Sequence, residues 1–195
     1  MSKKNLGIFV FDNVEVLDFA GPFEVFAVTN ELNNYSLLDV FLVSETTGTI
    51  SAKNGFKVVP DRYIKETDQL DILLVPGGEG ARKLLNNKNV ISWIKEISIK
   101  CELVLSVCTG ALVLAKAGLL EGLNVTTHHQ ATGELEKIVT NTNIVHGERF
   151  IDNGKVVTSA GISAGIDMSF HIIDRLFGEQ ISKKTMEYME YRLLK

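Results

Sequence analysis

The chain alternates between short apolar, β-rich runs and longer stretches in which apolar residues return at helical spacing. The runs predict strands over residues 6–11, 40–44, 72–75, 103–107, 125–127 and 156–159. The stretches predict helices over residues 22–32, 81–85, 90–98, 110–117, 130–140, 161–177 and 180–194. Strands that are apolar on both faces and alternate with helices are typical of a parallel sheet covered on both sides. We therefore predict an α/β protein, a flavodoxin-like, doubly wound sandwich with a mostly parallel central sheet.

Length and composition fit one folded domain. Of the 195 residues, 45% are hydrophobic and 23% are charged, and the mean hydropathy is +0.13, which allows a sizeable core. No linker, internal repeat or low-complexity tract interrupts the chain. We therefore expect a single domain over residues 1–195.

Charge and targeting signals indicate where the protein is located and which partners it is expected to lack. A net charge of −4, a pI near 5.6 and dispersed lysines are not typical of nucleic-acid binding. The apolar runs are far shorter than the roughly 20 residues of a membrane span, and the basic start at residues 1–5 leads straight into a predicted strand. Two cysteines in a chain without an export signal indicate reduced thiols. We expect a cytoplasmic protein that binds neither nucleic acid nor membranes.

The strongest candidate for chemistry is Cys108, which directly follows the strand predicted over residues 103–107. Ser106 before it and Gly110 after it are small, as a tight strand-to-helix turn requires when it projects a nucleophile into a cleft. Free N–H groups and the dipole of the next helix favour a thiolate, so we expect the pKa of Cys108 to lie below about 8.5. The alternative is an ordinary buried cysteine, which is the interpretation we favour for Cys101.

A glycine-rich loop follows the strand predicted over residues 72–75. Gly77 and Gly78 could present backbone N–H groups to a developing oxyanion, and a tight turn that needs glycine explains them equally well. The loop lacks the Lys-Ser/Thr ending of a phosphate loop, so it does not predict nucleotide binding.

Asp18 is an acidic residue within the apolar segment that follows the first predicted strand. Burial would raise the pKa of its carboxyl group and suit it to act as a general acid or base. Glu24 has a structural explanation, because we expect Pro22 at the first helical position, with Gly21 as the cap. Asp18 is therefore the predicted catalytic carboxyl group.

Two histidines follow the strand predicted over residues 125–127. His128 could line the cleft or act as a base, and helix capping or packing explains it equally well. Adjacent residues of a strand point to opposite faces, so His128 and His129 are unsuited to one metal ion, and no Cys/His set has zinc spacing. We predict neither a metal nor a cofactor.

Six short motifs, spread over nearly the whole chain, carry a resemblance to a known family. They are VLDFAGPFEV (16–25), VPGG (75–78), SVCTG (106–110), AGLL (117–120), TTH (126–128) and GISAGID (161–167). The chain resembles the DJ-1/PfpI family and, within it, the bacterial isonitrile hydratases. Thr109 stands where the protease-like branch has histidine, and Asp18 where the DJ-1 branch has glutamate. Ser159-Ala160 departs from the glycines typical of the hydratases, which implies a different pocket shape.

The resemblance implies roles for particular residues. Cys108 would be the elbow nucleophile, Asp18 its acidic partner, and Thr109 a neighbour that supplies backbone or hydroxyl contacts. The oxyanion and substrate-binding groups would come from Gly77, Gly78, His128, Gly161 and Ile162.

The activity implied by the resemblance is cysteine-dependent hydration of isonitriles to N-substituted formamides. One alternative is a glyoxalase-like or deglycase-like enzyme acting on 2-oxoaldehydes, in which His128 would matter more. Another is a non-catalytic redox or small-ligand sensor with an oxidisable Cys108. The same domain begins AraC-like regulators, but these need a helix-turn-helix region that we do not expect here. Family members are commonly homodimers, so we expect a homodimer that acts on a small-molecule substrate.

Overall fold

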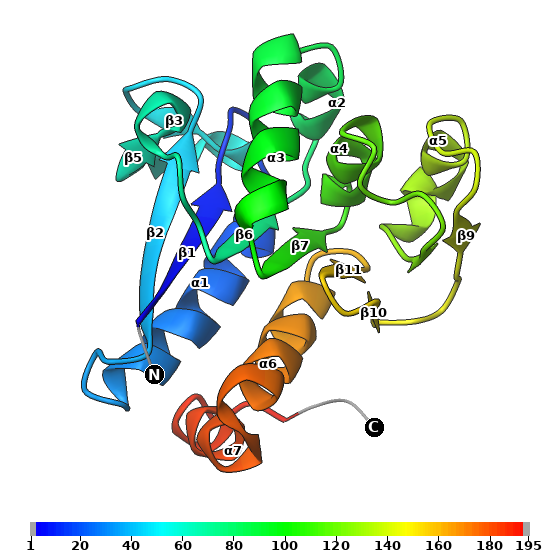
Figure 1. The fold of residues 1–195 in the computed structure, drawn as a ribbon. Coiled ribbons are helices and arrows are strands. Elements are labelled where there is room, and N and C mark those ends of the chain that lie inside the picture. The colour runs from blue at the N-terminus through cyan, green and yellow to red at the C-terminus, as the bar shows by residue number, and fades with distance from the viewer. Residues whose placement is uncertain (1–2, 193–195) are drawn as a thin grey trace.

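The centre of the protein is a seven-stranded sheet. The computed structural model describes residues 3–192. The strand order is β10-β11-β7-β6-β1-β2-β5, and every neighbouring pair is parallel except β10 with β11. The strands are β1 (Lys4–Phe9), β2 (Leu38–Ser44), β5 (Arg62–Tyr63), β6 (Ile72–Val75), β7 (Leu103–Val107), β10 (Phe150–Asp152) and β11 (Val156–Ser159). This mostly parallel α/β sheet confirms the predicted fold class (Figure 1).

Helices cover both faces of the sheet (Figure 1). One face carries α1 (Val16–Glu31), α6 (Ala164–Phe177) and α7 (Glu179–Tyr188), and the other carries α2 (Ala81–Leu84), α3 (Lys88–Lys100) and α4 (Gly110–Lys116). Within residues 3–192, no helix combines the length and the hydropathy that crossing a membrane requires.

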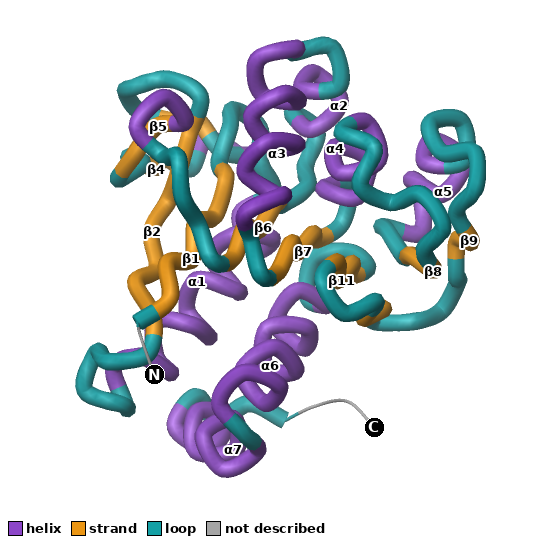
Figure 2. Tube along the Cα trace, in the orientation of Figure 1, coloured by secondary structure: helices purple, strands orange, loops and turns teal. Residues whose placement is uncertain are grey.

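Shorter elements lie outside the central sheet. They are the strand pairs β3 (Ile50–Ser51) with β4 (Lys57–Val58) and β8 (Asn124–Val125) with β9 (Asn143–Ile144), the helix α5 (Thr132–Leu135), and the 3-10 turns η1 (Lys53–Gly55), η2 (Ile64–Glu66) and η3 (His129–Ala131). Figure 2 shows that α5, β8 and β9 belong to one loop-rich side of the molecule.

The first helix begins earlier than predicted. It starts at Val16, so Pro22 lies inside the helix, Gly21 is not its cap, and Asp18 belongs to the first helical turn. Gly21 has a packing role instead, because a Cβ atom there would lie 2.9 Å from Cγ1 of Ile166 in α6. The Gly-Pro pair, which we interpreted as a helix start, thus lies where two helices pack together.

Several other predicted elements are shorter in the structure, among them the helix predicted over residues 161–177, which begins at Ala164. The strand predicted over residues 125–127 is reduced to β8, which pairs with β9 outside the central sheet. The helix predicted over residues 130–140 is reduced to the end of η3 and α5, and the one predicted over 180–194 ends at Tyr188, with residues 193 and 194 outside the described chain. Apolar spacing reports which face is buried, whereas tertiary contacts set where each element ends.

The parallel strands end together at one edge of the sheet. The register places Phe9 beside Val43, Val75 beside Ser106, and Ser159 beside Val107. The loops that follow β6, β7 and β11 therefore meet just beyond this edge, which is where open α/β sheets bind their ligands.

Candidate active site

Cys108 occupies a sharp turn between β7 and α4. Its φ of 57° lies in the left-handed region, which few non-glycine residues adopt. Its N–H donates to the carbonyl oxygens of Ser159 and Ala160 at 3.2 and 3.1 Å, so the chain after β11 helps to hold the turn. The predicted elbow is therefore present in the structure.

The turn opens on a cavity of about 450 Å³, which we call the Cys108 pocket. The residues that line it are Glu15, Lys53, Gly78, Glu79, Arg82, Cys108, Thr109, His128, Gln130 and Ile162. Five of these belong to the predicted site. The other three predicted residues lie directly behind the wall, because Asp18 bonds to Gly77 and Gly161 packs on the His128 ring.

Asp18 is completely buried behind Cys108. Its Oδ2 accepts a hydrogen bond from the N–H of Gly77 at 2.9 Å, and its Oδ1 has no hydrogen-bond partner among the described residues. Burial raises the pKa of the carboxyl group from 3.8 to about 7, while the Gly77 N–H and the Cys108 side chain oppose the rise. The carboxyl group is thus poised to gain or lose a proton near neutral pH, as the sequence predicts.

This raised pKa makes a prediction for stability. The folded state holds the Asp18 proton up to about pH 7, whereas the unfolded chain loses it near pH 3.8, so the contribution to stability falls as the pH rises between these values. The loss is on the order of 4 kcal/mol. Asp18→Asn, which cannot ionise, is therefore expected to melt at a higher temperature than the wild type at pH 8, with the difference shrinking toward pH 4. An equal difference at both pH values, measured by calorimetry, would contradict this.

The pKa of Cys108 moves opposite to the prediction. Burial, followed by the negative charge of Asp18, raises it from 9.0 to about 12, and the N–H groups of Thr109 and Ile162 only partly oppose this. The thiol side chain is nearly enclosed and α4 is short, so desolvation outweighs the helix N-terminus. Asp18 and Cys108 therefore titrate as a coupled pair that gives up its first proton near pH 7.

The N–H groups of the glycine loop are already engaged. Gly77 donates to Asp18, and Gly78 donates to the Thr109 hydroxyl at 2.9 Å, which in turn donates to the Gly78 carbonyl oxygen at 3.1 Å. A Cβ atom at Gly77 would lie 2.5 Å from the Thr109 nitrogen, so glycine is needed for this close approach. The structure therefore offers no free N–H at Gly77 or Gly78 for the predicted oxyanion role, and these residues instead hold Asp18 and Thr109.

Two other backbone N–H groups point at the Cys108 sulfur. They belong to Thr109 and Ile162, and both favour the thiolate over the thiol. Ile162 has a φ of 51°, so the loop after β11 adopts an unusual conformation at this contact. The residue after the elbow and the loop after β11 thus form a small anion-binding arrangement around the sulfur.

His128 lines the pocket beside this arrangement. Its Nδ1 accepts a hydrogen bond from the N–H of Gln130 at 3.2 Å, which places the proton of the neutral ring on Nε2. Burial, then the charges of His129 and Arg82, lower its pKa, so the ring is neutral at neutral pH. A Cβ atom at Gly161 would lie 2.2 Å from Cδ2 of His128, so this glycine allows the ring to sit where it does.

The rim of the pocket carries charged side chains that were not predicted from the sequence, among them Glu15, Lys53 and Arg82. Lys53 pairs with Glu15 at 3.2 Å, and Arg82 makes a two-pronged contact with Glu134 of α5 at 2.6 and 2.8 Å. Glu15 is the N-cap of α1 and Arg82 lies in the helix after the glycine loop, positions that place them near the edge of the sheet. No sequence signal marks Lys53, which arrives from a separate 3-10 turn.

The described part of the chain contains no group of three or more His, Cys, Asp or Glu side chains arranged to hold a metal ion. Cys101, which we interpreted as an ordinary cysteine, is buried, and burial raises the pKa of its thiol to about 11.

The fold and the site together define a class of α/β proteins with a cysteine at a strand-to-helix elbow. The sequence matches the DJ-1/PfpI family over residues 4–175, and the chain belongs to this family. It is 30% identical to the isonitrile hydratase of Pseudomonas putida over 189 residues, which cover 95% of this chain and 78% of that protein.

Other relatives are regulators and DJ-1 proteins. The HTH-type transcriptional regulator GbdR of Pseudomonas aeruginosa is 24% identical over 98% of this chain, which spans about half (52%) of that regulator. A ThiJ/PfpI family protein from Pseudomonas syringae has a TM-score of 0.89 at 21% identity, covering 100% of this chain and 78% of that one. Drosophila melanogaster DJ-1beta has a TM-score of 0.83 at 17% identity, and the match covers 99% of this chain and 100% of that one. These structures share the fold.

Proposed function

We propose that this protein hydrates isonitriles to N-substituted formamides, with Cys108 as the nucleophile and Asp18 as the group that carries its proton. The observation behind this proposal is the buried Asp18–Cys108 pair, whose two pKa values depend on each other at the wall of a pocket. The 30% identity to an isonitrile hydratase supports the same reaction.

The reaction uses one proton and one water molecule. As the sulfur attacks the terminal carbon of the isonitrile, Asp18 accepts the thiol proton and passes it to that carbon, which gives a thioimidate on Cys108. Water then adds to the thioimidate carbon, one of its protons goes to nitrogen, and the carbon–sulfur bond breaks. The other proton returns to the pair through Asp18, and the products are the formamide and the free thiol.

The remaining pocket residues stabilise these steps. The N–H groups of Thr109 and Ile162 hold the sulfur while it carries negative charge. Because Nδ1 of His128 is occupied by Gln130, its Nε2–H would be the donor to the nitrogen of the substrate. We assign Gly77, Gly78 and Gly161 to positioning. Gly77 allows Asp18 and Thr109 to approach closely, Gly161 does so for His128, and Gly78 for the backbone of residues 13–15.

The two alternatives are less consistent with the site. A 2-oxoaldehyde enzyme in which His128 is the base is less consistent with the site, because neutral His128 presents a donor, not an acceptor, at Nε2. Asp18 would have to be the base in that reaction as well. A redox sensor needs an accessible thiolate, whereas Cys108 is 6% exposed and the pKa of its thiol is raised to about 12. We therefore place hydration first. We also propose a cytoplasmic homodimer that binds a small-molecule substrate and, with a net charge of −4, no nucleic acid.

Product analysis tests this function. Wild-type protein is expected to convert cyclohexyl isonitrile to N-cyclohexylformamide, with no lactate from methylglyoxal in a parallel incubation. Cys108→Ser should form no formamide, whereas Cys101→Ser, which changes a cysteine outside the pocket, should keep the activity. Lactate formation would transfer the protein to the 2-oxoaldehyde enzymes, and the absence of both products would refute the proposed function.

A further inference from the structure

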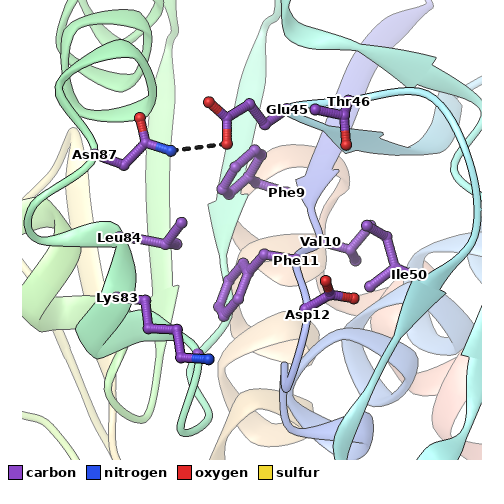
Figure 3. A pocket seen from close by; sticks show the side chains of 11 residues that line it. Phe9, Val10, Phe11, Asp12, Glu45, Thr46, Ile50, Lys83, Leu84 and Asn87 are labelled. Atoms are coloured by element: carbon purple, nitrogen blue, oxygen red, sulfur yellow. Dashed lines mark hydrogen bonds between the residues drawn. The ribbon is translucent and has the colours of Figure 1, made fainter.

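A second cavity, of about 220 Å³, lies at the carboxyl ends of β1 and β2 (Figure 3). It shares no lining residue with the Cys108 pocket. The two cavities lie on either side of α2, where Arg82 faces the Cys108 pocket and Lys83 faces the second one. Because β1 lies between β2 and β6, this is close to the point where the strand order reverses, a common ligand position in open sheets.

The second cavity has an apolar floor. Phe9 and Phe11 contribute two rings whose centroids are 5.8 Å apart, and Leu84 faces them from α2 (Figure 3). Phe9 is fully enclosed and supports the floor from behind, whereas Phe11 and Leu84, at 6% and 7% exposed, keep a small part of their surface open to the cavity. A hydrocarbon group of modest size is the natural complement to such a floor.

Charged groups of opposite sign stand around this floor. Glu45 is fixed, because its Oε2 accepts a hydrogen bond at 2.7 Å from Asn87, which itself caps α3 (Figure 3). Among residues 3–192, Glu45 has no ion-pair partner, and neither has Lys83 on the α2 side. Asp12 adds a second carboxylate, whose Oδ1 accepts from the N–H of Ser51.

We propose that this cavity binds a free α-amino acid with an apolar side chain. The ammonium group would pair with Glu45 and the carboxylate with Lys83, and the side chain would lie against Phe11 and Leu84. A volume of about 220 Å³ suits a ligand of this size and excludes a dinucleotide. The site is separate from the reaction at Cys108 and does not depend on it.

Calorimetric titration with L-leucine and L-phenylalanine tests this site. We expect saturable binding to the wild-type protein, and binding weaker by roughly tenfold or more for N-acetyl-L-leucine and L-leucinamide, each of which lacks one of the two charges. Lack of saturable binding by either amino acid up to about 10 mM would refute the proposal. Equal affinity for the charge-deleted analogues would do the same.

Variants locate the binding. Lys83→Ala and Glu45→Gln are each expected to raise the Kd by roughly tenfold, and glutamine can still accept the hydrogen bond from Asn87. Lys88→Ala, at an exposed position outside the cavity, should leave the Kd unchanged. Cys108→Ser should also bind normally, which separates this site from the reaction. Unchanged affinity in the first two variants, or lost affinity in Cys108→Ser, would place the ligand elsewhere and overturn the inference.

Discussion

Replacing Asp18 by asparagine is expected to lower kcat/KM for isonitrile hydration by about 10²- to 10⁴-fold. Asparagine keeps the shape of the side chain and can still accept the hydrogen bond from Gly77, but it can neither take the thiol proton nor return it. Since the pKa of Cys108 is raised to about 12, the thiol cannot ionise by itself at neutral pH. The rate of the variant therefore measures how much the reaction depends on Asp18 as the proton carrier.

The pH dependence distinguishes this role from a structural one. In the wild type, kcat/KM should rise with pH up to about 7 and then level off, because the attacking pair must first lose the proton held by Asp18. In Asp18→Asn the residual rate should show no step near pH 7. Asp174→Asn, which changes an exposed carboxylate on α6, should match the wild type. A residual rate within threefold of the wild type, or an unchanged step near pH 7, would rule out the proton-carrying role.

Most of the fold was predictable because its central strands are buried on both faces. The predicted strands over residues 72–75, 103–107 and 156–159 coincide with β6, β7 and β11, whose apolar runs have no polar alternation to obscure them. The segment from 125 to 140 was overestimated, because its apolar residues pack beside the sheet and not within it. The local spacing of apolar residues cannot distinguish a segment that packs beside the sheet from one that forms part of it.

The site was predictable only in part, for a similar reason. The elbow at Cys108 has a local signal, since a small residue and a glycine must flank such a turn. The raised pKa of its thiol has no local sequence signal, because it depends on burial and on Asp18, which lies in a helix distant in the sequence. Lys53 and Arg82 reach the rim from a 3-10 turn and from α2, whose positions relative to Cys108 are fixed only in the assembled protein.

The glycine loop shows how one sequence feature can have a different purpose from the expected one. The sequence left open whether the glycines present N–H groups to a reacting oxygen or only allow a tight turn, and the N–H groups of Gly77 and Gly78 instead bind Asp18 and Thr109. The loop thereby ties the carboxyl group to the residue after Cys108. Geometry at the elbow therefore depends on how closely the chain after β6 can approach the start of α4.

Gly110→Ala is expected to destabilise the protein strongly. A Cβ atom at residue 110 would lie 2.0 Å from the carbonyl oxygen of Val75 and 3.0 Å from that of Pro76, and both are backbone atoms that cannot rotate away. Either β6 or the elbow must shift, at a cost of roughly 3 kcal/mol or more. For a chain of this length, this corresponds to a fall in Tm of about 6–12 °C, measured by thermal unfolding.

Gly133→Ala is the matched control, because it adds the same methyl group to a helical glycine. Beyond its chain neighbours and the backbone of its own helix, no heavy atom lies within 4 Å of a Cβ atom at residue 133, and its φ is not in the left-handed region. The Tm of this variant should therefore stay the same or rise slightly. Because Gly110 follows the elbow directly, the shift should also move Cys108 relative to Asp18 and reduce turnover below the melting temperature. If Gly110→Ala and Gly133→Ala have the same Tm, the position of Cys108 does not depend on close packing of the elbow against the glycine loop.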